Sequence, residues 1–168
     1  MTPAPSAMRV RLVHKGDVPV IYQMLCESAA AQGASAELCV TPADLLEDGF
    51  RSTPTRFGCL IAEAGDQPAG LALYHRVYST WTSRSGLYLE DLYVAVPFRR
   101  QGVARALMTA LANIAVEAGC LHLQWMVLRA NTAATRFYES IGAEHVSEWM
   151  PMRIEREDLR RLARDPEP

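Results

Sequence analysis

The chain has 168 residues, 49% of them hydrophobic and 21% charged, and its 17 basic and 19 acidic side chains leave a formal net charge of -2. A chain of this size and apolar content can bury the core of one globular domain. The scattered basic residues argue against a nucleic-acid partner, and no apolar run approaches the ~20 residues that span a bilayer. We therefore expect a cytoplasmic protein without a nucleic-acid or membrane partner.

The chain opens with a Pro/Ala-rich lead, residues 1–7, which we expect to be flexible. Residues 8–14 then alternate apolar and basic side chains, which predicts a strand with one solvated face. A helix is expected next, with Asp17 as its cap and Gly33 as its end, because these residue types favour those positions.

A second, short helix is expected to begin at Thr41 and to end at Gly49. Thr41 can cap the helix, and the proline that follows it is favoured at the first helical position. Residues 57–64 and 69–78 are apolar and are joined by a Gly-containing turn, which predicts a β-hairpin. This pair of strands would begin an antiparallel sheet.

A strand, a helix and another strand follow a polar connector. Residues 87–94 are extended and mostly apolar, residues 101–118 show a helical apolar pattern, and residues 121–127 are apolar again. This order predicts two parallel strands joined by a helix. The helix then begins at the carboxyl ends of the strands, where ligands bind in such units.

A last helix is expected over residues 132–140, and short strands near Val146 and over residues 152–154 complete the predicted sheet. We assign residues 8–155 to one domain of the α/β class with a mixed sheet. Residues 156–168 are a polar tail that can form a loose helix.

The cysteines and histidines show no spacing typical of a metal or redox site. The four cysteines lie far apart, and no histidine has a regular spacing to an acid or a cysteine. We interpret the cysteines as small core residues, the histidines as structural or surface residues, and expect no metal. These residues are Cys26, Cys39, Cys59, Cys120, His14, His75, His122 and His145.

The most informative motif is Arg-Arg-Gln-Gly-Val-Ala at residues 99–104, between a strand and a helix. A glycine and a small residue at the start of a helix expose several backbone N–H groups, which can bind an anion such as a pyrophosphate. Arg99 and Arg100 could add charge-assisted hydrogen bonds to a phosphate. Arg105 in the first turn opposes the helix dipole unless an anion is bound. Taken alone, the motif is equally consistent with a structural turn.

Further residues extend the motif into a family pattern. Glu90-Asp91 lies upstream, and Asn131, Phe137-Tyr138 and Gly142-Ala143 lie downstream. Together with residues 99–104, they resemble the GCN5-related N-acetyltransferase (GNAT) superfamily. The resemblance implies an α/β (α+β) GNAT fold, with a mixed, mostly antiparallel central sheet of about six to seven strands and about four flanking helices.

The resemblance also implies acetyl-CoA as co-substrate and no metal. Residues 99–104 match the superfamily's pyrophosphate loop, and the segment from Asn131 to Ala143 matches the one that borders the CoA thiol. The cofactor-binding residues are then Leu92, Val94, Arg99, Arg100, Gln101, Gly102, Val103, Ala104, Arg105 and Asn131.

Within the superfamily, the chain resembles the diamine and polyamine branch, which includes the spermidine/spermine and thialysine N-acetyltransferases. Residues 44–50, 78–81 and 87–91 carry this resemblance. Tyr78-Ser79-Thr80-Trp81 with Arg84 looks more like the thialysine type. Members of the branch are usually homodimers, so the resemblance implies a homodimer whose partner subunit contributes to the acceptor site.

Acetyl transfer to a primary amine sets chemical requirements that three parts of the chain can meet. An alkylammonium has a pKa near ~10, so a carboxylate, or a water that it holds, must take the proton, and Glu90 is the best candidate. A backbone N–H around residues 92–94 could stabilise the oxygen of the tetrahedral intermediate. Tyr138 could donate a proton to the leaving thiolate, since a phenol has a pKa near ~10.

The acceptor end is defined by five residues. Neighbours on a strand point to opposite faces of the sheet, so we expect one carboxylate of Glu90 and Asp91 on each face. Trp81 could contact a cation through its ring, and Arg84 could pair with a carboxylate of the acceptor. Glu27 is more often a solvated residue on its helix, but by the resemblance it could hold the far ammonium of a diamine.

The sequence thus predicts an N-acetyltransferase that moves acetyl from acetyl-CoA to a primary amine of a small diamine, polyamine or thialysine/lysine-like amino acid by direct attack. Two alternatives remain at this point. One is a protein or peptide N-acetyltransferase, and the other is a non-catalytic acetyl-CoA-binding regulatory module. The choice of amine depends on the length and charges of the folded groove, which the sequence does not reveal.

Overall fold

The computed structural model describes residues 8–81 and 83–164, and the chain divides into two compact units. Unit 1 extends to Met126, and unit 2 begins at Val127. The strands of the sheet all lie in unit 1. Among the described residues, no helix is long and apolar enough to cross a membrane. The predicted lead, residues 1–7, and the end of the tail, residues 165–168, lie outside the described part.

Unit 1 is built around one mixed sheet. Its strands follow one another in chain order across the sheet, and each pairs antiparallel with the next, except that β4 and β5 run parallel. The parallel pair confirms the predicted strand, helix and strand unit. The strands are β1 (Met8–Leu12), β2 (Gly58–Ala64), β3 (Gln67–Ser79), β4 (Arg84–Val94) and β5 (Leu123–Gln124).

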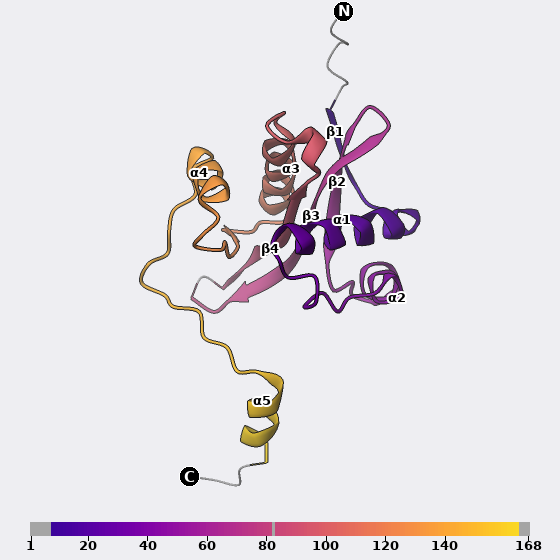
Figure 1. Ribbon diagram of the computed structural model, residues 1–168. Coiled ribbons are helices and arrows are strands. Elements are labelled where there is room, and N and C mark those ends of the chain that lie inside the picture. The colour runs from indigo at the N-terminus through magenta and orange to yellow at the C-terminus, as the bar shows by residue number, and fades with distance from the viewer. Residues whose placement is uncertain (1–7, 82, 165–168) are drawn as a thin grey trace, which may run out of the picture. The chain divides into compact units, whose positions relative to one another are not determined.

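α1 (Val18–Ala31) and α2 (Pro42–Leu46) cover one face of the sheet. Ile21 of α1 and Leu45 of α2 are buried in one cluster with Leu71 of β3. Fully burying a side chain of this size stabilises the fold by about 1.5–3 kcal/mol. Figure 1 shows α1 lying across the strands.

α3 (Val103–Glu117) covers the opposite face of the sheet. Gly70 lies next to Leu71 in β3 and therefore faces the other way. A Cβ at Gly70 would approach Val103 and Leu107 of α3 at 3.1 and 3.3 Å, and the carbonyl oxygen of Tyr93 at 2.5 Å. The lack of a side chain at this position lets the start of α3 pack closely on the sheet.

The two helix starts that the sequence predicts differ in the structure. Thr41 caps α2, since its Oγ1 accepts from the Asp44 N–H and the Asp44 carboxylate accepts from the Thr41 N–H. Asp17 precedes α1 but does not cap it with its side chain. Its carboxylate accepts instead from the His14 N–H and from Arg11. Short turns are η1 (Lys15–Asp17), η2 (Glu47–Arg51) and η3 (Val96–Phe98).

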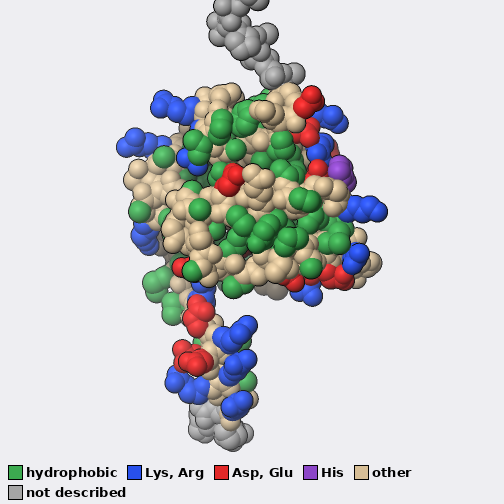
Figure 2. All heavy atoms as spheres, turned by 45° about the vertical axis from the view of Figure 1, so that its right-hand side comes forward, with side chains coloured by type: hydrophobic (Ala, Val, Ile, Leu, Met, Phe, Trp, Pro, Cys, Tyr) green, Lys and Arg blue, Asp and Glu red, His purple; other side chains and the backbone are tan. Residues whose placement is uncertain are grey.

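Unit 2 contains α4 (Thr132–Ser140) and α5 (Arg156–Leu162). α4 matches its predicted range, and α5 gives the polar tail a helix with closely mixed acidic and basic side chains (Figure 2).

The predicted strands near Val146 and over residues 152–154 are wrong, because unit 2 has no strand in its described part, residues 127–164. A strand needs a hydrogen-bonded neighbour, and the apolar side chains of Trp149 and Met152 remain exposed. The described sheet therefore has five strands instead of six to seven.

Candidate active site

A β-bulge in β4 sets the geometry of the site. The pairing with β3 skips one residue between Leu89 and Asp91, so Glu90 is an extra residue in β4. Leu89 and Leu92 therefore share one face, and Glu90 and Asp91 lie together on the other, the face that α1 covers. The prediction of one carboxylate on each face is wrong, because a bulge interrupts the alternation that it assumed.

The two carboxylates form a cluster with one histidine of β3. Burial, and to a smaller extent the charge of Glu90, raises the pKa of Asp91 to about 6. The Nε2 of His75 lies 3.6 Å from the Oε2 of Glu90. The His75 ring stacks on Tyr88, with 5.1 Å between ring centroids. Two acids on one face of a strand can attract a cation and accept a proton from it.

Beyond the bulge, no strand of the described residues pairs with the edge of β4 that faces away from β3, which we call the open edge. In the described part of the chain, β5 pairs with Leu87 and Tyr88, before the bulge. The N–H of Ala95 donates to the Ala69 carbonyl at 3.0 Å, so every second residue before it also points its backbone groups at β3. The backbone groups of Leu92 and Val94, which alternate with these, point to the open edge.

The loop after β4 exposes the start of α3. Arg100 and Gly102 both have positive φ, 62° and 85°, and Gly102 precedes the first turn of α3. No side chain among the described residues caps this end of α3, and its first backbone hydrogen bond runs from the Ala106 N–H to the Gly102 carbonyl. The N–H groups of the first turn therefore have no partner within α3 and can bind an anion. Arg99 Nε donates to the Val94 carbonyl at 3.1 Å, which ties the loop to β4.

Glu27 of α1 is held by two hydrogen bonds. Its Oε2 accepts from the Tyr93 hydroxyl at 2.9 Å, and its Oε1 accepts from the Gln23 amide at 2.9 Å. Burial and Glu27 raise the pKa of Tyr93, and the nearby Arg99 opposes part of that rise. Tyr93 thus connects α1 to the strand that precedes the loop at residues 95–102.

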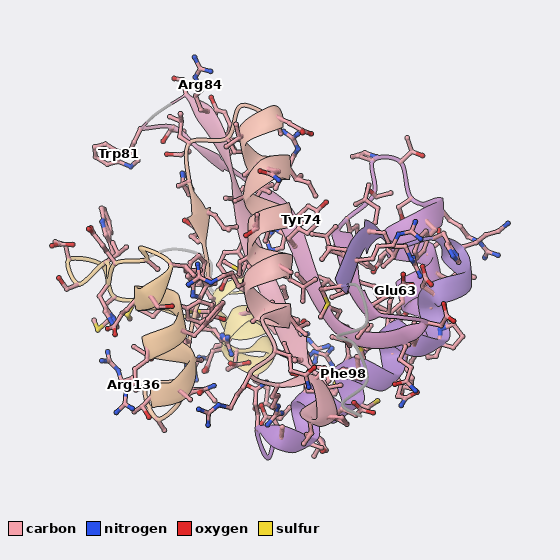
Figure 3. The ribbon with its side chains drawn as sticks, turned by 90° about the horizontal axis from the view of Figure 1, so that it is seen from above. Glu63, Tyr74, Trp81, Arg84, Phe98 and Arg136 are labelled. Carbon is pink, nitrogen blue, oxygen red and sulfur yellow. The ribbon has the colours of Figure 1, made fainter. Side chains whose placement is uncertain are left out.

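Trp81 and Arg84 lie at the other end of β4. In Figure 3 they stand at one end of unit 1, and Phe98, in the loop between β4 and α3, stands at the other. Glu90 lies six positions after Arg84, which amounts to about 20 Å along a strand. Trp81 is 88% exposed. Within one chain, the structure does not bring Trp81 and Arg84 together with the carboxylates.

Unit 2 carries Asn131 and Tyr138. The Oδ1 of Asn131 accepts from the Ala134 N–H at 3.1 Å and so caps α4. Burial raises the pKa of Tyr138, which keeps its phenol protonated near neutral pH. Phe137 contacts the Tyr138 ring, with 5.3 Å between centroids.

Residues 22–143 match the sequence profile of the Acetyltransferase (GNAT) family. The chain belongs to this family. The predicted family is confirmed, and with it an N-acetyltransferase on a mixed α/β fold. Members of the GNAT family use acetyl-CoA as co-substrate.

Several relatives resemble the chain over most of its length. A mouse thialysine N-epsilon-acetyltransferase is 33% identical over 169 residues, which cover 94% of this chain and 98% of that protein. A human spermidine/spermine N(1)-acetyltransferase-like protein 1 is 34% identical over 92% of this chain and 24% of its own length. An integron cassette protein from the mobile metagenome of V. cholerae has a solved structure with a TM-score of 0.77 and 25% identity, covering 94% of this chain and 98% of that one.

The sequence did not indicate two residues that the structure adds to the site, His75 and Tyr93. His75 meets Glu90 through the pairing of β3 with β4, and that register is not visible in residue spacing. Tyr93 was part of an apolar strand pattern, but its hydroxyl reaches Glu27, 66 residues earlier. A buried tyrosine hydroxyl usually finds a partner, which is the one signal that could have indicated such a contact.

Proposed function

We propose that this protein transfers the acetyl group of acetyl-CoA to a primary amine of a small diamine, polyamine or thialysine/lysine-like amino acid. The observation that carries the proposal is the pair of carboxylates, Glu90 and Asp91, on one face of β4 beside an open strand edge. A protonated amine neutralises such a pair, and the curated relatives include proteins named for acetylating thialysine and spermidine or spermine. A homodimer and a cytoplasmic location are part of the proposal.

The cofactor assignment rests on the loop and the open edge. The N–H groups of Gly102, Val103 and Ala104 would hold the pyrophosphate, with Arg99 and Arg100 adding charge. Gln101 and Arg105 lie in the same turn, and the amides of Leu92 and Val94 would meet the acyl-bearing arm along the open edge. Asn131, in unit 2, is the last of the residues that we propose to bind the cofactor.

The chemical steps need one base and one acid. Glu90 would take a proton from the ammonium, so that the neutral amine can attack the thioester carbonyl. An outward-facing N–H of Leu92 or Val94 would stabilise the charge that develops on the carbonyl oxygen. Tyr138 would protonate the departing sulfur, a role that suits a phenol whose pKa is raised.

Some of the groups that would bind the acceptor lie near Glu90, and others lie at the far end of β4. Asp91 lies beside Glu90, and Glu27 lies on α1, where it could hold a second ammonium. Arg84 lies about 20 Å from Glu90 along β4, and Trp81 lies in the turn between β3 and β4. In a homodimer, this hairpin end would contact the acceptor bound by the partner subunit.

A competition assay tests the proposal. The purified enzyme receives acetyl-CoA with putrescine, spermidine and thialysine together, CoA release is followed, and acetylated products are identified by mass. We expect at least one acetylated amine, and a Tyr138→Phe variant that loses kcat more than it raises KM. Background turnover with every amine would overturn the proposal.

The same assay separates the two alternatives. Turnover with peptides alone would favour a protein or peptide N-acetyltransferase. Acetyl-CoA binding with a turnover that neither Tyr138→Phe nor Glu90→Gln changes would favour a regulatory module. A preference for the acceptor that carries a carboxylate would point to Arg84 or another nearby arginine as its partner.

A further inference from the structure

His75 on β3 lies next to Glu90, the proposed base. It faces Tyr88 across the β3 and β4 pair, and its ring stacks on the Tyr88 ring at an angle of 25°. Its Nε2 lies 3.6 Å from the Oε2 of Glu90. The stacked ring fixes the direction in which the imidazole presents Nε2 to the carboxylate.

The other ring nitrogen of His75 favours one tautomer. Its Nδ1 lies 3.3 Å from the carbonyl oxygen of Arg76, and a carbonyl can only accept a hydrogen bond. Nδ1 therefore carries the proton in the neutral ring, and Nε2 presents a lone pair to Glu90. An imidazole in this state can accept a proton from a carboxylic acid.

We propose that His75 acts through Glu90 and receives the proton that Glu90 removes from the acceptor ammonium. This inference rests on the proposed function. In the first step, an N–H bond of the ammonium breaks and an O–H bond forms on Glu90. In the second, that O–H bond breaks, an N–H bond forms on Nε2, and His75 becomes an imidazolium.

The exposure of His75 completes this relay. Its side chain is 36% exposed, so the imidazolium can release its proton to solvent and return to the neutral tautomer. The distance of 3.6 Å is longer than a hydrogen bond, but catalytic contacts often tighten when substrate binds. Glu90 is then ionised again before the next ammonium arrives. It must be ionised at the start of each turnover in order to accept a proton.

Two substitutions of His75 separate a polar contact with Glu90 from proton transfer. His75→Gln places an amide near the position of Nε2, so it can contact Glu90 but cannot accept its proton. His75→Ala removes both functions and leaves space for free imidazole. We expect kcat to fall about 10-fold or more in both variants, with KM within about 2-fold, because general acid-base groups contribute 10²–10⁴-fold and the relay acts through one of them.

Added imidazole gives the decisive readout. We expect it to raise kcat of His75→Ala several-fold and to leave His75→Gln unchanged. His145→Gln is the matched control, since His145 lies 3.6 Å from Glu139 in a comparable pair. This control should keep kcat within about 2-fold. Thermal melts confirm that each variant is folded.

A double variant isolates the role of Glu90. In a Glu90→Gln background, His75→Gln should cause no further loss, because the relay has no proton to receive. The inference is overturned if His75→Gln retains wild-type kcat, if imidazole does not restore His75→Ala, or if the two losses add fully. A low Glu90→Gln activity with normal His75 variants would leave the proposed function standing, whereas an active Glu90→Gln variant would remove the base itself.

Discussion

Two clusters of acids in unit 1 differ in what faces them. Arg11 binds Asp17 at 2.7 Å and Glu63 at 2.8 Å, so its guanidinium neutralises a carboxylate from each of two elements. Its hydrogen bonds to Asp17 hold the pKa of that carboxyl below its usual range. In the second cluster, the charge that acts on Asp91 is that of Glu90, and the pKa of Asp91 is raised to about 6.

The difference shows how the same residue type serves structure in one place and chemistry in another. The first cluster connects β1, β2 and the turn before α1, and its charges are already satisfied within the fold. The second leaves negative charge uncompensated where a cationic substrate could neutralise it. His75 is a modest partner there, since it is cationic only when protonated.

The largest expected effect comes from removing the proposed base. Glu90→Gln keeps the shape of the side chain but cannot accept a proton, so we expect kcat/KM for the amine to fall about 10²–10³-fold. CoA release at varied amine concentration measures this loss. Glu63→Gln makes the same chemical change in the first cluster, where Arg11 pairs with Asp17 and Glu63.

The control variant sharpens the contrast between the clusters. Glu63→Gln should lower stability modestly and leave kcat within about 2-fold of the wild type, because Glu63 meets Arg11 and not the substrate. Equal losses of activity in the two variants would contradict the division into a structural and a chemical cluster.

The next largest effect concerns stability. Asp17→Asn weakens the two charged hydrogen bonds from Arg11, which keeps Glu63 as its partner, and we expect the free energy of unfolding at pH 7 to fall by about 3 kcal/mol. Asp17 has a lowered pKa, so its stabilisation is present above the ordinary pKa of aspartate and is lost as the pH falls through the folded value. Urea unfolding at pH 7 and at successively lower pH should show the two proteins converging.

Asp91→Asn should act in the opposite direction. The pKa of Asp91 is raised to about 6, so its contribution to stability is full below the ordinary pKa of aspartate and is lost as the pH rises through 6. At pH 8 the ionised carboxylate costs up to about 3 kcal/mol, and the variant should be more stable by up to that amount while acetylating its amine more slowly. Urea unfolding at pH 8 and pH 4 checks this, and a wild type more stable at both would contradict it.

The sequence predicted most of the elements of unit 1 because their signals are local. Thr41 caps α2 as expected, since the capping residues lie within one turn. The positive φ of Gly102 is likewise set by its own residue type, at the start of α3. The bulge at Glu90 was not predictable, because it exists only relative to β3, and it reversed the predicted placement of the two carboxylates.

Pairing across strands also explains why the cluster at Glu90 was seen only in part. The acids stood out as charges in an apolar strand, but His75 lay in a different segment of the sequence with no spacing to connect them. The strands expected near Val146 failed for a related reason, since apolar residues predict extended chain but do not supply a neighbour to pair with.

The smallest expected effect concerns the hydrogen bond between Tyr93 and Glu27, which can serve both the stability of the fold and the binding of the amine. Tyr93→Phe removes the hydroxyl that donates to Glu27, while the ring stays in the core, so we expect stability to fall by about 1 kcal/mol. Glu27 then keeps its hydrogen bond from Gln23 but gains freedom to meet an ammonium. If Glu27 binds the far end of a diamine, the variant should change KM for putrescine and leave KM for acetyl-CoA unchanged. Gln23→Ala frees the other oxygen of the same carboxylate, so a shift of KM in Tyr93→Phe alone would mean that Glu27 acts through Tyr93 on β4 and not directly on the amine.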